Sequence, residues 1–563
     1  MTPLKIYLSP NHSIASTSGG DAEGVGWRFQ DCCGSEDHTK PLVVSTAKLP
    51  SSSSGQLKLE DIDQNLMRFN GPDDMDDPQN WSRNYKWFVT MICAFMTVNV
   101  TFASSAPTAS TQLIAEKFGV TLEVANLLTS LFLLGYVAGP ILWGPGSEVF
   151  GRRPVFIVTM TCYTLFILGQ ALARNTATLL ITRFFSGFFA CAPLTNAAGL
   201  IADIWDPILR GPATSIFVMM VFLGPVLGPV VGGFIAQETG DFRWVFWVMF
   251  IFAAVASTLA IAFVPETYAP RILELRARRL RAEDPVNNQH LYAEAERHGL
   301  DITSFMDRTI KRPFVMLAVE PILLLITIYI SVLYGILYGL FEAVPIVFSI
   351  KHDFTVAQSG LTFIGVGVGV ILSCAIAIHK SRMYGALVKE WRGHPPPENR
   401  LQGAMVAAPV MVIGVFWFGW TGNYPNVHWA APAVSLVLVG FSVTLIFISF
   451  VSYLVDTYLM HAASALAANT IVRSAIAAAF PLFTTQMYER MGVQWASTLI
   501  GLIALVLAPI PFLFFKYGAR IRRRSQFAPC ADLKLVEVSA QTLGSVKIAM
   551  VELPHRSAVG ASV

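Results

Sequence analysis

The stretch GPGSEVFGRRP, residues Gly144–Pro154, lies between two hydrophobic runs that are each long enough to cross a lipid bilayer. It combines several glycines with one acid, Glu148, and two adjacent arginines, Arg152 and Arg153. Such a short charged turn cannot form a domain of its own. We interpret it as a tight hairpin at a membrane surface, which joins two spanning helices and holds charge where they meet. The stretch therefore predicts a polytopic helical membrane protein.

The composition of the whole chain agrees with this interpretation. Of the 563 residues, 54% are hydrophobic and 14% are charged, and the mean hydropathy is +0.54. Soluble domains carry about a quarter charged residues, so this chain lacks the polar surface of a water-soluble protein. The net charge of +3 gives no reason to expect a nucleic-acid partner. The seven cysteines have no spacing typical of disulfide frameworks or zinc sites, and we expect no metal, cofactor or catalytic residue.

Working outward from the hairpin, we find twelve candidate spans of about 20 apolar residues each. A long charged loop splits them six and six, which predicts an all-α membrane protein with two pseudo-symmetric six-helix bundles. The spans are 87–107, 124–143, 154–173, 178–202, 212–236, 244–264, 318–341, 359–380, 402–420, 430–455, 462–485 and 493–515. The expected divisions are a disordered N-terminal tail at 1–86, the first bundle at 87–264, a linker at 265–317, the second bundle at 318–516 and a C-terminal tail at 517–563.

Basic residues gather beside one set of span ends and are scarce beside the other. Because lysine and arginine mark the cytoplasmic side, we expect both tails and the linker to be cytoplasmic. The linker begins with RILELRARRLR, Arg271–Arg281, in which aliphatic residues alternate with arginines. This pattern fits an amphipathic helix on the inner membrane surface and a solvated linker helix equally well.

Small residues recur at a four-residue spacing in every third span. This spacing places them on one helix face, where two backbones can approach closely. Their recurrence in spans two, five, eight and eleven predicts two halves that meet along these faces. Ordinary helix packing is the alternative. The positions are Gly135 and Gly139, then Gly224, Gly228 and Gly232, then Gly365 and Gly369, then Ser464 and Ala468.

Charged groups inside spans are costly, so each is a candidate for function. Arg473 lies deepest, near the middle of span eleven, where a functional role and a structural ion pair are equally open. Arg183 lies nearer the outer end of span four, and we expect it to set the pKa of a neighbouring carboxylate. Glu320 and Glu342 lie at the two ends of span seven, and Glu342 is the preferred proton carrier. Two further acids are expected to be solvated charges at helix ends: Asp203 and Asp456.

Span five contains GPVLGPVVGG, with two prolines in one helix. Proline removes a backbone donor, so this span is expected to be kinked and closely packed against neighbours that satisfy the freed carbonyls. An incidental kink is the alternative. The residues of this motif are Gly224, Pro225, Gly228, Pro229, Gly232 and Gly233.

Several polar and aromatic residues occur where a central cavity would lie. Aromatic residues in spans more often face lipid, but any that line a cavity would favour bulky amphipathic or aromatic substrates over sugars or inorganic ions. The candidates are Asn99, Phe102, Asn196, Tyr334, Tyr338, Phe450 and Tyr453.

With these features in hand, residues 76–525 resemble the major facilitator superfamily, and within it the fungal twelve-helix drug:proton antiporters. The hairpin is similar to the family's loop motif through Gly144, Glu148, Gly151, Arg152 and Arg153. It departs by having Gly146 where leucine is usual and Val149 where a basic residue is frequent, and its acid is glutamate where many members have aspartate. Further matches are Arg183–Gly187, Gly224–Gly233, DDPQNW (Asp76–Trp81), PETYAP (Pro265–Pro270) and AASALAANTIVRSA (Ala462–Ala475).

The resemblance implies a proton-driven exporter that works by alternating access, with the proton gradient as its energy source and no cofactor. It implies that Glu148 pairs with the arginines and with the end of span eleven, as a cytoplasmic latch. The Arg183 stretch resembles a motif linked to proton coupling, and the span-five motif is typical of antiporters. Implied substrates are drugs, toxins or secondary metabolites, moved by a monomer in the cell membrane or the vacuolar membrane.

Two other functions were weighed. A proton-coupled importer of a small nutrient could use the same scaffold. A membrane-embedded enzyme or a sensor is the third reading, but we find no nucleophile–base pair, metal cluster or phosphate-binding loop in the sequence to support it.

Overall fold

The computed structural model describes residues 26–31, 65–71, 73–206, 209–297, 311–391, 395–522, 525–528 and 533–538. The disordered tails expected at 1–86 and 517–563 fall mostly outside these ranges. The chain divides into two compact units. One contains the antiparallel pair β1 (Gly26–Asp31) and β2 (Leu533–Val538), in which Gly26 lies opposite Val538. The other contains the helices.

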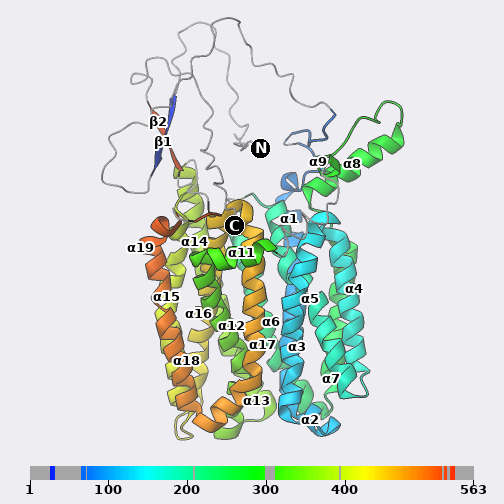
Figure 1. Ribbon diagram of the computed structural model, residues 1–563. Helices are drawn as coiled ribbons and strands as arrows, with labels where there is room; N and C mark the ends of the chain where they lie inside the picture. The colour runs from blue at the N-terminus through cyan, green and yellow to red at the C-terminus, as the bar shows by residue number, and fades with distance from the viewer. Residues whose placement is uncertain are drawn as a thin grey trace, which may run out of the picture. The chain divides into compact units, whose positions relative to one another are not determined.

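In the described residues, twelve helical stretches are long and apolar enough to cross a membrane, which confirms the predicted helical fold (Figure 1). The first six are α1 (Arg83–Ser105) continued by η3 (Ala106–Ser110) and α2 (Thr111–Phe118), α3 (Leu122–Val149), α4 (Arg152–Ala171), α5 (Thr176–Ile204), α6 (Arg210–Thr239) and α7 (Arg243–Phe263).

The last six spans follow the linker helices α8 (Ala269–Glu283), α9 (Glu294–Arg297) and α11 (Arg312–Val319). They are α12 (Pro321–Pro345) with the π-helix η5 (Ile346–Lys351), α13 (Val356–Leu361) with α14 (Phe363–Trp391), η6 (Pro397–Leu401) with α15 (Gln402–Gly422), α16 (Ala430–Tyr458), α17 (Ala462–Met491), and α18 (Val493–Leu507) with α19 (Ile510–Arg522). Two short 3-10 helices, η2 (Pro78–Asn80) and η7 (Leu459–His461), precede α1 and α17.

The predicted hairpin is tighter than the sequence indicated. Helix α3 runs through Gly144 and Glu148 to Val149, and α4 begins at Arg152. The turn therefore centres on Gly151, whose φ of +96° is a conformation that residues with a Cβ rarely adopt. The first half of the quoted stretch is thus helical, and only its second half reverses the chain.

The two halves pack by the same scheme. In the first half, α1 packs on α6 and α3 packs on α5. The second half repeats this with α12 on α17, and with α14 against α16 at Gly369 and Gly440. The packing of span one on span five is therefore matched in the second half by spans seven and eleven. The packing of span two on span four is matched by spans eight and ten. The halves meet where α3 contacts α17 and where α6 contacts α13.

The halves meet at the spans that we predicted, two with eleven and five with eight, but the glycine stripes themselves do not form that contact. A Cβ at Gly135 or Gly139 would collide with α5, and one at Gly224 or Gly228 would collide with α1. In the second half, the stripe of α14 faces α16 in the same way. The four-residue spacing correctly indicated close approach of backbones. It carries no information on which neighbour approaches, and here the neighbour belongs to the same half.

Besides Arg278, which pairs with Glu274 and Glu296, three arginines of the linker helix α8 pair with acids of this chain. Arg271 contacts Glu274 at 2.7 Å, and Arg281 contacts Glu296 at 2.5 Å. The third, Arg276, reaches Asp74 at 2.8 Å, in the segment that precedes α1. Backbone donation from Asn70, together with Arg276, lowers the pKa of Asp74. The start of the first span is thereby tied to the linker.

Candidate functional site

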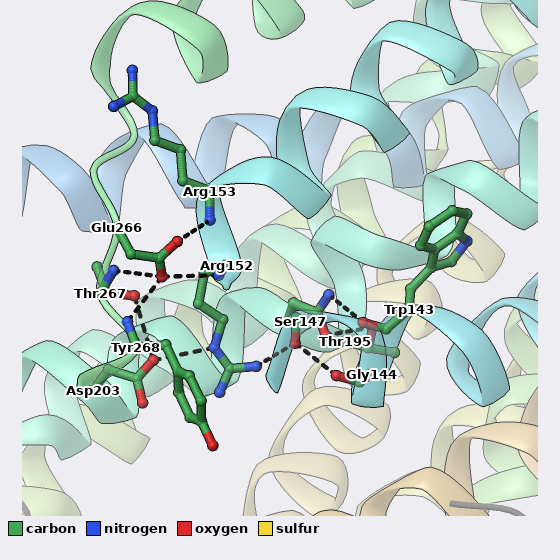
Figure 2. A network of polar contacts seen from close by, with 11 residues as sticks. Trp143, Gly144, Ser147, Arg152, Arg153, Thr195, Asp203, Glu266, Thr267 and Tyr268 are labelled. Carbon is green, nitrogen blue, oxygen red and sulfur yellow. Dashed lines mark hydrogen bonds and ion pairs between the residues drawn. The ribbon is translucent and has the colours of Figure 1, made fainter. Parts of the chain in front are cut away.

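The end of the bundle that carries α8 is rich in arginine, and we call it the basic end; the opposite end carries α2 and α13 (Figure 1). At the basic end, the hairpin is held by Glu266 of the PETYAP stretch. Its carboxylate accepts the backbone N–H groups of Arg152 at 2.9 Å and Arg153 at 3.2 Å (Figure 2). It also accepts those of Thr267 and Tyr268, both at 3.0 Å. Because these arginine amides open α4, Glu266 places an anion at a helix N-terminus.

The Arg152 side chain turns away from Glu266 into the first half. Its Nε atom contacts Asp203 at 3.2 Å, and its guanidinium donates to Ser147 at 2.5 Å (Figure 2). The ring of Tyr268 lies 5.3 Å from the guanidinium carbon. The arginine is 8% exposed, so this ion pair is largely shielded from water. Asp203 is therefore a partner in the hairpin, not the solvated end charge that we predicted.

The latch that we expected from Glu148 is absent from this conformation. Glu148 is exposed and has no hydrogen bond or ion pair with any residue in the described ranges. The acids that engage the hairpin come instead from the ends of α5 and α7. Glu148 sits in the last turn of α3.

The second half has its own charge network at the basic end. Asp456 accepts from Arg400 at 2.8 Å and from Tyr384 at 2.9 Å, so it too is paired, against our expectation. Glu398 and Arg522 form a two-pronged ion pair, at 2.9 and 3.0 Å, in which both side chains are less than a tenth exposed. Together these pairs join the ends of α14, η6, α16 and α19.

Glu320 also belongs to this network. It is 1% exposed and accepts hydrogen bonds from Tyr458 at 3.2 Å and from Ser525 at 2.7 Å. The backbone N–H groups of Gln526 and Phe527 donate to its other oxygen, at 3.0 and 3.2 Å. Glu320 therefore holds the segment after α19 against the start of α12. These contacts give it a structural role, and its proton-coupling role stays a prediction.

Arg183 is fully buried among backbone carbonyls. Its guanidinium donates to Ala103 at 2.6 Å, to Ser104 at 3.1 Å and to Leu128 at 3.0 Å. A longer contact of 3.5 Å reaches Gln170. In the part of the chain that the structure describes, no carboxylate contacts it. The prediction that Arg183 acts directly on a neighbouring carboxylate is therefore wrong for this conformation, and the residue instead ties α5 to α1 and α3.

Glu342 lies between the two halves, towards the opposite end. Its carboxylate accepts from Asn126 of α3 at 3.3 Å and from Thr485 of α17 at 3.2 Å. It is half-buried. Nearby, Gln486 of α17 donates to Glu123 of α3 at 3.2 Å. The preferred proton-carrier candidate thus sits in a polar contact that closes the opposite end.

Arg473 lies among aromatic rings near the middle of the bundle. Its guanidinium carbon is 4.9 Å from the ring centre of Tyr334 and 5.0 Å from that of Phe447. Phe222, from the first half, meets both rings edge-on, at 6.3 and 5.1 Å. Arg473 is 5% exposed. The structural ion pair that was one of its two open roles is not formed with any described residue.

The remaining cavity candidates are all buried, but they do not form one cluster. Tyr338 meets Ser104 across the halves, with 2.8 Å between their hydroxyls. Asn196 donates to the Trp143 carbonyl at 3.0 Å, and the side-chain amide of Asn99 has no partner among the described residues. The others pack on aromatic neighbours in their own half: Phe102 on Phe252, Phe450 on Tyr329, and Tyr453 on Phe514.

The span-five motif is buried against α1. Ser105 donates to the Pro225 carbonyl at 2.9 Å, which satisfies a backbone group beside the proline as predicted. Towards the opposite end, Gly233 and Pro229 meet α13 at Val356 and Gly360. One face of the motif therefore packs against α1 in its own half, and another face contacts α13 of the other half.

Two groups of functional residues were missed by sequence reasoning. Asn126 and Thr485, which share Glu342, are ordinary polar residues in apolar spans, and only their position inside a span could have singled them out. Glu266 was predicted only as part of PETYAP, without a role of its own; it lies at the start of the linker, where its carboxylate caps α4.

Comparisons with known proteins agree with this architecture. A family profile described as Major Facilitator Superfamily matches residues 88–481. The MFS-type transporter acdC of Aspergillus candidus is 40% identical over 466 residues, which is 83% of this chain and 91% of that one. The citrinin biosynthesis cluster MFS transporter mrr1 of Monascus ruber is 39% identical over 469 residues, covering 83% and 93%. The MFS-type efflux pump MFS2 of Trichophyton rubrum is 41% identical over 478 residues, covering 84% and 80%.

Among solved structures, the proton:xylose symporter XylE of E. coli superposes with a TM-score of 0.56 at 17% identity. The match covers 78% of this chain and 96% of XylE, and it bears on the fold alone. The family profile spans most of the chain, and the relatives are about 40% identical along four-fifths of it. Both comparisons assign the chain to the same family. This chain belongs to the major facilitator superfamily.

Proposed function

We propose that this protein is a proton-coupled exporter of amphipathic small molecules that works by alternating access. The observation that carries the proposal is the position of Glu342, a protonatable group whose carboxylate is shared by α3 of one half and α17 of the other. A group in this position can couple its own protonation to the separation of the halves.

The coupling follows from hydrogen-bond chemistry. As a carboxylate, Glu342 accepts from Asn126 and Thr485 and helps to hold the opposite end closed. Protonation removes the charge that strengthens both bonds, because hydrogen bonds to a charged group are about twice as strong as neutral ones. Loading a proton thus favours opening of this end, and losing it favours closure.

At the basic end, the hairpin network supplies the opposing gate. We expect Arg152, Asp203 and Glu266 to rearrange when that end closes, with Glu148 then free to engage a partner that it does not have here. Alternation between the two ends would then carry the substrate across. This scheme keeps the predicted hairpin gate of Gly144, Glu148, Gly151, Arg152 and Arg153. In it, the contacts of Glu148 that close the basic end form in a different conformation.

Direction and location rest on two further arguments. The basic end carries most of the arginines beside the spans, so we place it, with both tails, in the cytoplasm. Relatives at about 40% identity are named an efflux pump and a biosynthesis-cluster transporter, which favours export of a drug, toxin or secondary metabolite. We propose a monomer in the cell membrane, with the vacuolar membrane as the alternative.

The first test compares small molecules inside and outside cells with and without this protein. Under the proposal, at least one amphipathic compound accumulates inside the cells that lack it. That compound is then assayed in inside-out vesicles with an acidic interior, where wild type should concentrate it. Glu342→Gln should abolish gradient-driven accumulation, while Glu116→Gln, on the exposed surface of α2, should leave it intact. Normal gradient-driven transport by Glu342→Gln would refute the assignment of the proton carrier.

Import of a small nutrient on the same fold is the alternative function. Its specific support is that XylE, a proton symporter, shares the fold, which is support at the level of fold only. Right-side-out vesicles with acid outside separate the two: an importer accumulates its substrate under that gradient, and an exporter does not.

A further inference from the structure

Two arginines are buried inside the spans, and their surroundings differ. Arg183 has three backbone carbonyls within hydrogen-bond distance, so its charge is well solvated by the protein. Arg473 is 5% exposed, and its Nε atom has no hydrogen-bond partner among the described residues. It also forms no ion pair with them. Its contacts are the faces of two aromatic rings, Tyr334 and Phe447.

A cation in this position requires a counter-charge. A buried charge is stable only when it is paired or well hydrogen-bonded, and in the membrane interior such groups mark ligand pathways. Aromatic faces attract a cation but accept no strong hydrogen bond from its N–H groups. The surroundings of Arg473 therefore attract the cation, but no described residue accepts a hydrogen bond from its Nε atom.

The acids of the neighbouring helix α12 cannot supply that acceptor. Glu342 lies two turns beyond Tyr334, about 12 Å along the helix axis, and is already bonded to Asn126 and Thr485. Glu320 lies about 21 Å from Tyr334 in the other direction and is bonded to Tyr458 and the segment after α19. Neither carboxylate can reach Arg473 without breaking its own network and moving along the bundle.

Groups around Arg473 indicate the rest of the ligand. The hydroxyl of Tyr334, which is 2% exposed, has at most the hydroxyl of Tyr338 as a hydrogen-bond partner, and that of the adjacent Ser474 has none within the described ranges. Both can donate to an anion. Phe222 from the first half and Phe447 from the second stand edge-on to one another, with ring centres 5.1 Å apart. Together these residues present donors and aromatic surface, and they come from both halves.

We propose that Arg473 binds the carboxylate of an aromatic organic acid, so that this protein selects anionic substrates with a flat ring. The ring packs against Phe222, Tyr334 and Phe447, and the carboxylate takes the hydrogen bonds that Arg473 lacks. This assignment rests on the proposed export function and narrows its substrate class. Because Phe222 and Arg473 belong to different halves, the bound acid also contacts both moving parts.

The test measures binding of two probes that differ only in charge, 2-naphthoate and 2-naphthamide, to the purified full-length protein by equilibrium dialysis. Wild type should bind naphthoate at least about tenfold more tightly, as expected for hydrogen bonds to a charged group. Arg473→Gln should bind both probes equally, with naphthamide affinity within about twofold of wild type. Arg473→Lys should keep part of the preference, since lysine retains the charge without the planar fork. Arg174→Gln, which removes an exposed cation outside the spans, should change neither affinity.

Each outcome decides the matter. Equal binding of the two probes by wild type overturns the proposal, and so does the absence of binding by either. An Arg473→Gln protein that keeps the preference also overturns it. If that variant does not fold, the preference in wild type and its reduction in Arg473→Lys decide in its place.

Proton-driven transport of a compound found in the cellular comparison tests the export function separately. Wild type that exports without charge preference refutes only this inference, and wild type with the preference but no gradient-driven transport refutes only the export function.

Discussion

Replacement of Gly135 by alanine tests whether the small-residue stripe of α3 packs inside its own half. A Cβ at this position would lie 2.6 Å from the carbonyl carbon of Gly187 and 2.6 Å from the carbonyl oxygen of Phe184. Both are backbone atoms of α5, so no side-chain rotation can relieve the collision. The two helices would have to separate locally by about 1 Å to restore an ordinary contact.

The expected loss of stability combines two opposing effects. Overpacking of this kind costs about 1–3 kcal/mol. Alanine returns up to about 1 kcal/mol because it is the better helix former. The net loss is about 1–2 kcal/mol, since no side chain can absorb the strain and the separation also weakens contacts above and below Gly135. For a protein of this size, that corresponds to a fall in Tm of about 1–2 °C.

The assay is thermal unfolding of the purified protein in detergent, with Gly144→Ala as the matched control. Gly144 lies on the same helix, and nothing approaches within 4 Å of its Cβ position. The control should unfold at or slightly above the wild-type temperature. Equal Tm values for the two variants would refute the packing argument. Loss of transport by Gly135→Ala at unchanged Tm would restore the original prediction that this face meets the other half.

Three further changes test the charge networks at the basic end. Glu266→Ala leaves two α4 amides without an acceptor and should lower the stability to unfolding by about 1–3 kcal/mol. Glu148→Ala, measured by the same unfolding assay, should lower it little. Equal losses of stability in the two variants would contradict the assignment of Glu266 as the acid that holds the hairpin. Arg522→Ala leaves Glu398 buried and unpaired, with an expected loss of about 3–5 kcal/mol. Adding Glu398→Leu to it should recover much of that loss, and a double variant no more stable than the single one would speak against an unpaired charge as the cause. Glu320→Gln should speed proteolysis of the segment after α19 while proton-driven transport persists, and loss of gradient coupling in this variant would return Glu320 to the list of proton carriers.

The membrane fold followed from the sequence because apolar length is a direct physical requirement of a bilayer. Twelve runs of sufficient length predicted twelve spans, and a charged loop at 265–317 divided them evenly. The hairpin was also located correctly, since glycine at position 151 marks the one residue there whose backbone excludes most side chains. These features depend on local composition and need no knowledge of which helices are neighbours.

Contacts between helices were predicted less well. The stripe at Gly135 was assigned to the wrong neighbour, and Asp203 and Asp456 were expected to be solvated although both are paired. Glu148 was expected to pair with the arginines, whereas Arg152 pairs with Asp203 and Glu266 accepts the backbone N–H groups of both arginines. In each case the sequence indicates that a group is small or charged at a given depth. The residue that contacts this group comes from another span, far along the chain. The periodicity within one span does not indicate which residue that is.

The two buried arginines show why this limit matters for function. Arg183 and Arg473 each lie inside an apolar span, and the sequence treats them alike. Among the described residues, the fold brings three carbonyls to Arg183 and none to Arg473. The reason is that α1 and α3 cross α5 where their carbonyls are within reach, whereas α12 and α16 present aromatic rings to α17. A satisfied cation holds helices together, and an unsatisfied one is available to a ligand. The difference between two identical side chains is therefore a property of the neighbouring helices, and it is the reason that we propose a binding role for Arg473 and a structural role for Arg183.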